Sequence, residues 1–225
     1  MSIPPALASA SVIVVRDGRA APEVLLVRRN TKIAFHGGSW VFPGGKVDAV
    51  DRTAETGGDA IEIARRTAAR EAREETGVVL DGRDLAPFSH WTTPETQPKR
   101  FATWIFFARV SVDTEVVIDR SEITDYRWLA VADALEQRAS DEIQLPAPMF
   151  VSLTKLGAFQ QAAAIADHVN GGEVERFVPR IVELDEGRAA LYQEDAGYRS
   201  LDLSAEGARH RLMMMKSGWE YLNNY

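Results

Sequence analysis

The sequence predicts an α/β fold, in which strands come before and after one long helix. β-Branched and aliphatic runs at residues 11–16 and 23–29 precede the helix, and further runs at residues 85–91 and 100–110 follow it. Runs of this length and composition are typical of strands, whereas the segment between them carries helix start and stop signals. The order of elements favours the α/β class without choosing a topology.

The first hairpin and the central helix each have local signals. Asp17-Gly18 lies between the first two apolar runs and predicts a hairpin turn. Asp59 followed by Glu62 resembles a capping box, which predicts that the helix begins there, and Gly77 supplies a left-handed stop. The helix should pack on the sheet through a narrow stripe of small apolar residues, namely Ile61, Ala64, Ala68 and Ala72.

The later elements divide the chain into a main domain, residues 1–140, and a C-terminal helix and hairpin extension, residues 141–225, packed on it. The main domain should end with a short strand and a helix, at residues 125–129 and 131–138. The extension should contain a helix and two hairpin-like segments, at residues 146–169, 175–184 with a turn at 185–187, and 209–216 with a turn at 217–218.

Composition excludes several classes of protein. The 225 residues carry a net charge of −7 and no basic run, which disfavours extended binding to nucleic acid but leaves a mononucleotide open. The absence of cysteine removes disulfides, thiolate metal sites and a cysteine nucleophile. No apolar stretch has the length of a membrane span, and the first residues lack the pattern of a signal peptide. We therefore expect a cytoplasmic protein without a membrane partner.

The most informative segment is residues 70–78, Arg-Glu-Ala-Arg-Glu-Glu-Thr-Gly-Val. Its spacing places Glu71, Glu74 and Glu75 on one face of the predicted helix. Three clustered carboxylates repel one another, and a hard divalent cation would relieve that repulsion. The alternative is an ordinary charged helix with ion pairs such as Arg70 with Glu74.

Together with the upstream Phe-Pro-Gly-Gly at residues 42–45, this segment resembles the Nudix box of the Nudix hydrolases. The family's pattern is a glycine, five residues, a glutamate, seven residues and then Arg-Glu-apolar-x-Glu-Glu-x-Gly-apolar. Counting eight back from Arg70 gives Glu62 as the family's first glutamate, whereas the glycine is displaced to Gly45. The excess of 11 residues, from Val47 to about residue 57, is interpreted as a loop insertion.

The resemblance implies a Nudix α/β/α sandwich with a mixed sheet and the hydrolysis of a phosphoanhydride with Mg²⁺ or Mn²⁺ as cofactor. It makes Glu74 and Glu75 the principal metal ligands and Glu71 either a further ligand or the acceptor of the proton of the attacking water. Arg70 would orient the glutamates, and the carbonyl of Gly45 is a further candidate ligand. These roles make Glu71, Arg70 and Glu74 the candidate catalytic residues.

Many Nudix enzymes use another acidic residue from a later loop. Glu122 lies just before the strand at residues 125–129, where the chain could return it to the metal. Glu95, in the turn-rich segment at residues 93–98, is the competing candidate, and a site completed by neither residue is the third alternative.

The segment at residues 25–30, Leu-Leu-Val-Arg-Arg-Asn, is similar to the coenzyme A signature of the family. Its first arginine is Arg29, but Ala34 occupies the position of the second. The peroxisomal branch of Nudix acyl-coenzyme A diphosphatases also lacks the second arginine and carries an insertion after the Gly-Gly pair. We therefore expect 3′,5′-ADP and phosphopantetheine or its acyl derivative as products, with Arg29 and Arg100 as phosphate contacts and Trp91 as a platform for adenine.

Three alternatives stay open at this point. The substrate of an active enzyme could instead be ADP-ribose, NADH or a nucleotide sugar, each a small nucleotide diphosphate. A non-catalytic Nudix domain could act as a nucleotide sensor, although the intact carboxylates favour catalysis. The extension could cover the site, recognise substrate or form a homodimer interface.

Overall fold

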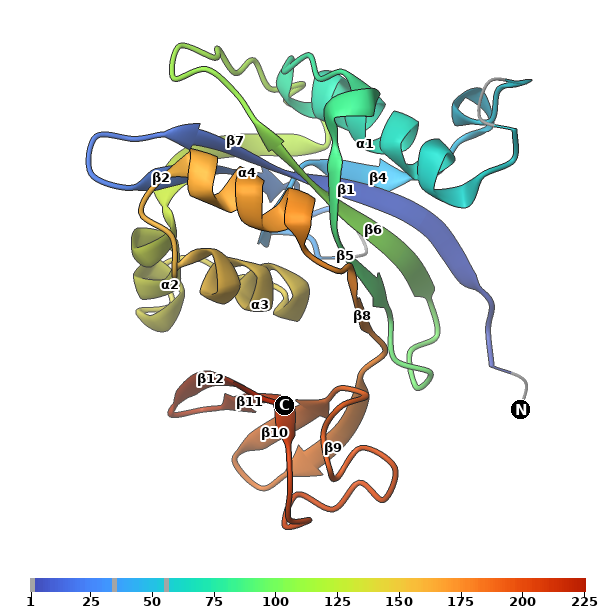
Figure 1. The fold of residues 1–225 in the computed structure, drawn as a ribbon, viewed down its shortest axis with the longest axis vertical. Helices are drawn as coiled ribbons and strands as arrows, with labels where there is room; N and C mark the ends of the chain where they lie inside the picture. The colour runs from blue at the N-terminus through green and yellow to red at the C-terminus, as the bar shows by residue number, and fades with distance from the viewer. Residues whose placement is uncertain (1–2, 34–35, 55–56) are drawn as a thin grey trace.

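The computed structural model describes residues 3–33, 36–54 and 57–225, which form two sheets and four α-helices (Figure 1). The strands of the larger sheet are β1 (Ala6–Asp17), β2 (Pro22–Arg29), β3 (Trp40–Val41), β4 (Gly44–Lys46), β5 (Ala86–Thr92), β6 (Arg100–Arg109), β7 (Ile123–Ala130) and β8 (Glu175–Phe177). Those of the smaller sheet are β9 (Arg180–Leu184), β10 (Gly187–Leu191), β11 (Arg209–Met215) and β12 (Gly218–Asn224). The helices are α1 (Ala60–Thr76), α2 (Val131–Ala139), α3 (Ala147–Leu156) and α4 (Ala162–Gly171), with 3₁₀ turns η1 (Ala49–Asp51) and η3 (Gly82–Asp84). In the described part of the chain, no helix has the length and apolar character that crossing a membrane requires.

Helices cover both faces of the larger sheet. Successive side chains of β1 point to opposite faces, and because they are apolar on both, each face needs a covering layer. Val12 and Val14 pack with three alanines of α1, namely Ala64, Ala68 and Ala72. Ile13 and Val15 join the cluster to which α2, α3 and α4 contribute. All four β1 side chains are fully buried, and each contributes roughly 1.5–3 kcal/mol of hydrophobic stabilisation. The predicted α/β/α sandwich is therefore confirmed: of the α-helices in the described residues, α1 covers one face of the sheet and α2, α3 and α4 cover the other (Figure 1).

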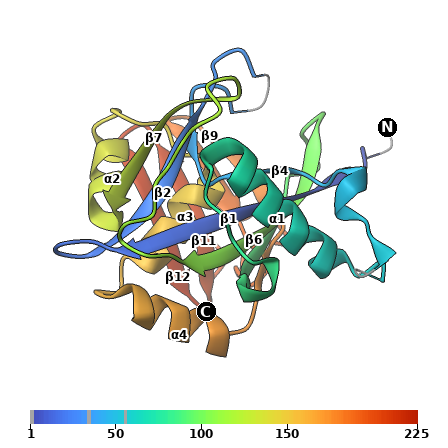
Figure 2. The same cartoon turned by 90° about the horizontal axis from the view of Figure 1, so that it is seen from above.

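The strand β1 also makes the sheet mixed and positions the Gly-Gly pair at the start of β4. It runs parallel to β6 and antiparallel to β2 and β4. In the β4 pairing, Gly44 lies opposite Ser11 and Gly45 lies opposite Ala10. Seen from above, α1 lies across β1 and β4, so the Gly-Gly pair is held beside the carboxylate helix (Figure 2).

The limits of α1 confirm the local signals in the sequence. Asp59 is the N-cap, and its carboxylate accepts a hydrogen bond from the backbone N–H of Ile61 at 2.9 Å. Gly77 ends the helix with a left-handed φ of 72°, a conformation that glycine adopts without a Cβ clash. Its N–H donates to the carbonyl of Arg73 at 2.9 Å.

The prediction of one helix over residues 146–169 is wrong, because the chain forms α3 and α4 separately. Gly157 follows α3, and its N–H closes the last turn on the carbonyl of Leu153 at 2.9 Å. Glycine weakens a helix interior, and Phe159 packs against the core immediately afterwards. The break lets both helices bury apolar side chains on the same face of the sheet.

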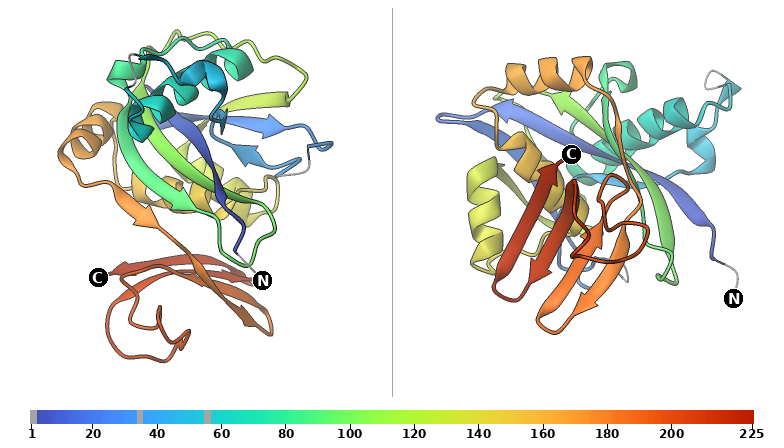
Figure 3. Two further views of the ribbon diagram at one scale, coloured as in Figure 1. Left: turned by 90° about the vertical axis from the view of Figure 1, so that its right-hand side faces the viewer. Right: turned by 60° about the horizontal axis from the view of Figure 1, so that its bottom comes forward.

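The expected hairpin at residues 175–184 is also divided, whereas the turns at 185–187 and 217–218 are confirmed. Its first part, β8, pairs in parallel with β5 of the larger sheet. Pro179 separates β8 from β9, since proline has no N–H to continue a ladder. The four strands from β9 to β12 then form a sheet beside α3 (Figure 3). There, the rings of Trp219 and Phe150 are in contact, with centroids 5.4 Å apart.

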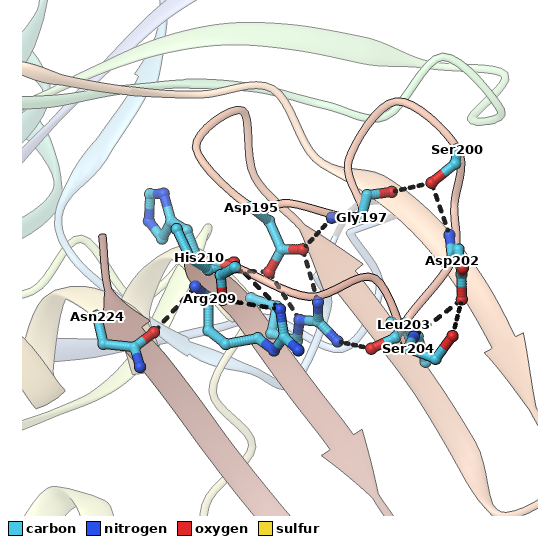
Figure 4. A network of polar contacts seen from close by, with 12 residues as sticks. Asp195, Gly197, Ser200, Asp202, Leu203, Ser204, Arg209, His210 and Asn224 are labelled. Atoms are coloured by element: carbon cyan, nitrogen blue, oxygen red, sulfur yellow. Dashed lines mark hydrogen bonds and ion pairs between the residues drawn. The ribbon is translucent and has the colours of Figure 1, made fainter.

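A buried ion pair organises the loop between β10 and β11. Asp195 is 4% exposed and accepts hydrogen bonds from the backbone N–H groups of Gly197 and His210 at 2.8 and 2.9 Å (Figure 4). The guanidinium of Arg211 donates to both of its carboxylate oxygens, at 2.7 and 2.6 Å. Burial alone would raise the pKa of Asp195, but these hydrogen bonds hold that pKa below its usual value.

Candidate active site

The three glutamates of α1 differ in burial, although the helix brings them to one side. Glu75 is 5% exposed, the side chain of Glu71 is 16% exposed, and that of Glu74 is 58% exposed. The order follows from helix geometry, because Glu71 and Glu75 are four residues apart and face the sheet edge, while Glu74 faces outward. The helix thus presents two shielded carboxylates and one open to solvent.

The first two residues of β4, Gly44 and Gly45, contact both shielded carboxylates. The N–H of Gly44 donates to Oε2 of Glu75 at 2.9 Å. A Cβ atom at Gly45 would lie 2.4 Å from the carboxyl carbon of Glu71, a distance that two such atoms do not reach. Glycine at position 45 therefore lets the backbone approach the carboxylate, and any larger residue would have to displace the end of the Glu71 side chain.

This crowding changes the protonation of the glutamates. Burial raises the pKa of Glu75 to about 8, with the charges of Glu71 and Glu122 adding to the rise, while the N–H of Gly44 and the charge of Arg29 oppose it. Burial also raises the pKa of Glu71, and there Arg70 opposes the rise. Strongly shifted carboxyl groups that face one another are a common property of catalytic and metal sites.

Arg70 is the cation that holds this group together. Its Nη1 lies 2.8 Å from Glu71 and 2.9 Å from Glu74. Its Nε and Nη2 donate to the two carboxylate oxygens of Asp51 at 2.9 and 3.0 Å, and Nη2 also reaches the carbonyl of Lys46 at 3.2 Å. A guanidinium fixed by a two-point contact of this kind has little freedom to rotate. The expected orienting role of Arg70 therefore has a geometric basis.

Asp51 is a site residue that the sequence reasoning missed. It is 2% exposed and also accepts from the hydroxyl of Thr67 at 2.9 Å and from the N–H of Asp48 at 2.8 Å. Burial by itself would raise the pKa of Asp51, but the hydrogen bonds from Arg70 and its neighbours hold that pKa below its usual value. Asp51 therefore stays ionised and keeps Arg70 in place.

The assignment of Glu62 as the first acidic residue of the pattern needs correction. Glu62 is half exposed and pairs with Arg65 at 3.2 Å, one turn along the helix. Asp51 follows Gly45 at the family's own spacing of five intervening residues, with aspartate in place of glutamate. The additional residues consequently lie between Asp51 and Arg70, and the spacing from Gly45 to Asp51 was the signal that could have found Asp51.

The sheet brings Arg29 and Glu122 toward the same carboxylates. Arg29 ends β2 opposite Ile123 of β7, and the N–H of Asn30 donates to the carbonyl of Glu122 at 2.7 Å. Asp119 orders the loop by accepting from the N–H groups of Glu122 and Ile123 at 2.8 and 2.9 Å. Glu122 is exposed, yet its charge raises the pKa of both Glu71 and Glu75.

The competing candidate, Glu95, lies elsewhere. It is exposed in the loop between β5 and β6. Burial raises the pKa of Tyr198, in the C-terminal extension, and the charge of Glu95 adds to that rise. Between the two candidates, the arrangement favours Glu122.

Two predicted substrate contacts lie away from the glutamates. Arg100 is 9% exposed, and its guanidinium donates to the carbonyls of Thr93 and Pro4 at 3.1 and 2.9 Å. Trp91 is 5% exposed, and its ring stacks on Phe177 with centroids 3.9 Å apart. It belongs to the core on the face of the sheet opposite α1. The roles of both residues in binding stay predictions that this arrangement does not support, and Ala34 lies outside the described residues.

The chemistry of the donor set fits a hard divalent cation. The groups around Gly45 offer only oxygen ligands, and burial with mutual repulsion makes the ionised carboxylates costly without a cation. In the conformation described, Arg70 forms ion pairs with Glu71 and Glu74. Within residues 3–33, 36–54 and 57–225, no three histidine or acidic side chains lie close enough together to hold a metal ion. The cation would therefore have to draw Glu74 and Glu71 toward Glu75.

Comparison with known proteins agrees with this arrangement. The family model described as NUDIX domain matches residues 6–147. Acyl-coenzyme A diphosphatase NUDT19 of Xenopus laevis is 27% identical over 110 residues, which are 46% of this chain and 29% of that protein. The human protein of the same name is 27% identical over 140 residues, or 57% of this chain and 37% of that protein. The matched regions are thus well under half of the length of these two relatives.

A solved structure shows the same fold. The crystal structure of a NUDIX hydrolase from Alicyclobacillus acidocaldarius matches with a TM-score of 0.66 and 24% sequence identity, covering 76% of this chain and 100% of that one. The family model covers more than half of the chain, and the Arg-Glu-x-x-Glu-Glu run lies on the helix of the site. The chain therefore belongs to the NUDIX domain family.

Proposed function

We propose that the protein is a metal-dependent diphosphatase that hydrolyses the internal phosphoanhydride of coenzyme A or an acyl-coenzyme A. The observation that carries the proposal is the meeting of opposite charges at one sheet edge. The pKa values of Glu71 and Glu75 are raised, first by burial and further by the charge of Glu122, and Arg29 acts on Glu75 from the end of β2. A diphosphate needs both partners, carboxylates to hold a cation and an arginine to bind phosphate oxygens.

Arg29 supports this assignment by its own surroundings. Its Nε is buried and has no hydrogen-bond partner among the described residues. A buried donor left unpaired costs free energy, which a phosphate oxygen would recover by accepting from it. The guanidinium is thus positioned as an anion contact beside the carboxylates.

Each residue of the site has a role in the proposed reaction. Glu75, Glu74 and Glu122 would hold Mg²⁺ or Mn²⁺ together with the carbonyl of Gly45, and the bound cation would neutralise the phosphates and lower the pKa of a water. Glu71, whose pKa burial raises, would accept the proton of that water. Arg70 positions Glu71 and Glu74 through the contacts to Nη1.

The choice of coenzyme A rests on two further supports. The Leu-Leu-x-x-Arg run of residues 25–29 places Arg29 at the phosphate-binding position of the family's coenzyme A signature. Both curated relatives described above are named acyl-coenzyme A diphosphatases, although they are matched over only part of their length. Cleavage would give 3′,5′-ADP and phosphopantetheine or its acyl form.

The decisive experiment is product identification by mass spectrometry with Mg²⁺ or Mn²⁺. The panel should contain coenzyme A, acetyl-coenzyme A, a long-chain acyl-coenzyme A, ADP-ribose, NADH and UDP-glucose. Release of 3′,5′-ADP from the coenzyme A compounds alone supports the proposal. Cleavage confined to ADP-ribose, NADH or UDP-glucose overturns the substrate assignment, and tight binding without any cleavage indicates a nucleotide sensor.

Neighbouring residues provide matched controls for the assigned roles. Arg29→Gln should raise KM for the substrate about tenfold or more by removing a charged hydrogen bond, whereas Arg28→Gln, an exposed neighbour on the same strand, should not. Glu122→Gln should weaken binding of Mn²⁺, measured by calorimetry, and Glu95→Gln should leave it unchanged. Equal effects within either pair would contradict the corresponding role.

A further inference from the structure

Two surface hollows adjoin the outer side of the carboxylate helix. The first has a volume of about 480 Å³ and is lined by Ala69, Arg70, Arg73, Glu74, Val79 and Leu80. The second has a volume of about 330 Å³ and shares Val79 and Leu80 with the first. It continues past Asp81 and Asp84 to the segment from Ala108 to Thr114. We call the two hollows together the Val79 groove.

The groove changes in chemical character along its length. At the carboxylate end, Arg73 is exposed, and its guanidinium forms no ion pair with any residue that the structure describes. The middle is an apolar wall formed by Ala69, Val79 and Leu80, in which Val79 is 76% exposed. The far hollow adds mostly polar residues, among them Ser111 and Thr114.

We propose that the Val79 groove binds the pantetheine arm of the substrate, an inference that rests on the proposed function. The arm of coenzyme A begins with a phosphate, continues with a dimethyl-substituted carbon and then carries two amides. The groove matches these groups, because its first hollow offers the guanidinium of Arg73 and an apolar wall, and its second hollow adds charged and hydroxyl side chains, among them Ser111 and Thr114. Glu74 and Arg70 line the same hollow, so the groove begins at the proposed reaction centre.

The match also explains an exposed apolar side chain that the fold does not use. Val79 follows the left-handed Gly77 and lies outside both core clusters, whereas its neighbour Val78 is 3% exposed within one of them. A valine that is mostly exposed contributes little to folding. Its position between Arg73 and the second hollow gives it a function as the apolar contact for the dimethyl group.

Val79→Asp tests the proposal, with Val117→Asp as its control. Both valines are exposed, at 76% and 70%, so neither change should unfold the protein, and Val117 lines neither hollow. Val79→Asp should weaken binding of 4′-phosphopantetheine, measured by calorimetry on the full chain, by about tenfold, the low end for a lost apolar contact. It should raise KM for coenzyme A by a similar factor and leave kcat nearly unchanged, whereas Val117→Asp should change neither quantity.

Arg73→Gln provides a second variant at the charged end of the groove. It should weaken 4′-phosphopantetheine binding as well, and pantetheine without its phosphate should bind this variant and the wild type equally. Equal binding of 4′-phosphopantetheine by the wild type, Val79→Asp and Val117→Asp would overturn the proposal. A change of oligomeric state in Val79→Asp with unchanged binding would overturn it too, since the groove would then cover a second copy of the chain.

The substrate panel separates this proposal from the one on which it rests. If the wild type cleaves none of the coenzyme A compounds, the proposed function fails on that result alone. Binding of 4′-phosphopantetheine that Val79→Asp weakens and Val117→Asp does not would still support the groove. Absence of binding to the wild type would overturn the groove, whatever the panel shows.

Discussion

Replacing Asp51 with asparagine is the sharpest test of how the carboxylate helix is organised. The carboxylate of Asp51 accepts four hydrogen bonds, three of them at Oδ2, from Thr67, Asp48 and Nη2 of Arg70. The fourth joins Oδ1 to Nε of Arg70 at 2.9 Å. An asparagine can keep its oxygen at the Oδ2 position, but its amide nitrogen then faces Nε of Arg70. Both groups are hydrogen-bond donors, so this hydrogen bond is lost.

The size of the effect follows from this geometry. The variant loses one charge-assisted hydrogen bond and the negative charge that balances Arg70. Breaking a buried ion pair by removing one partner costs about 3–5 kcal/mol. Arg70 is 21% exposed at its side chain and keeps its contacts with Glu71 and Glu74. We therefore expect the free energy of unfolding to fall by about 2–3 kcal/mol, which is less than the loss expected for a fully buried ion pair.

The assay compares Asp51→Asn with Glu62→Gln in urea-induced unfolding and in turnover of the substrate. Glu62 is the acid that counting back from Arg70 selects, but it is half exposed and pairs with Arg65 at 3.2 Å. Its replacement should change the free energy of unfolding by less than about 0.5 kcal/mol and leave turnover intact. Asp51→Asn should also depress kcat, because Arg70 would lose the two-point contact that fixes its guanidinium and would position the glutamates less precisely. Equal effects of the two substitutions would refute the assignment of Asp51.

Three further outcomes are expected. Glu75→Gln should stabilise the metal-free protein near pH 9 but not near pH 5. The pKa of this carboxyl rises from 4.5 to about 8 on folding, so the native protein loses stability as the pH rises between these two values. Urea-induced unfolding at pH 5 and pH 9 measures the difference in the free energy of unfolding. The effect of pH has the opposite sign for Asp195, whose lowered pKa contributes stability that is complete above about pH 4 and decreases as the pH falls further. Asp195→Asn should therefore cost about 3–5 kcal/mol at pH 7 and progressively less as the pH falls below about 4. Gly45→Ala must displace the carboxylate of Glu71 and should lower kcat about a hundredfold, whereas Gly171→Ala, whose Cβ meets nothing within 4 Å, should leave turnover unchanged.

The parts of the structure that could be predicted from the sequence depend on local interactions. The cap at Asp59 and the stop at Gly77 act within one helical turn, so the limits of α1 could be read directly. The helix spacing likewise placed the three glutamates on one side. The division of residues 146–169 was not predictable in the same way, because Gly157 is compatible with a helix and the break depends on packing against the core.

The errors at the site concern contacts between distant segments. Alternation along β5 indicates that Trp91 faces one side of the sheet, but not which side α1 covers. Arg100 donates to Pro4, and that contact spans 96 residues of sequence. Neither relation leaves a local pattern, so two plausible substrate contacts were placed where the structure has core and backbone partners.

The long segment between Asp51 and α1 shows which part of the pattern is constrained in space. Asp51 is fixed by its spacing from Gly45 and by Arg70, and the glutamates are fixed by α1, so the chain between Asp51 and the cap at Asp59 needs only to connect two anchored ends. The cost of closing a loop grows only with the logarithm of its length, so extra residues there are inexpensive. The same residues placed between Gly45 and Asp51 would remove Asp51 from Arg70. The pattern therefore tolerates an insertion after its first acidic residue and not before it, which explains why this chain departs from the family's spacing in that interval while its carboxylates stay together.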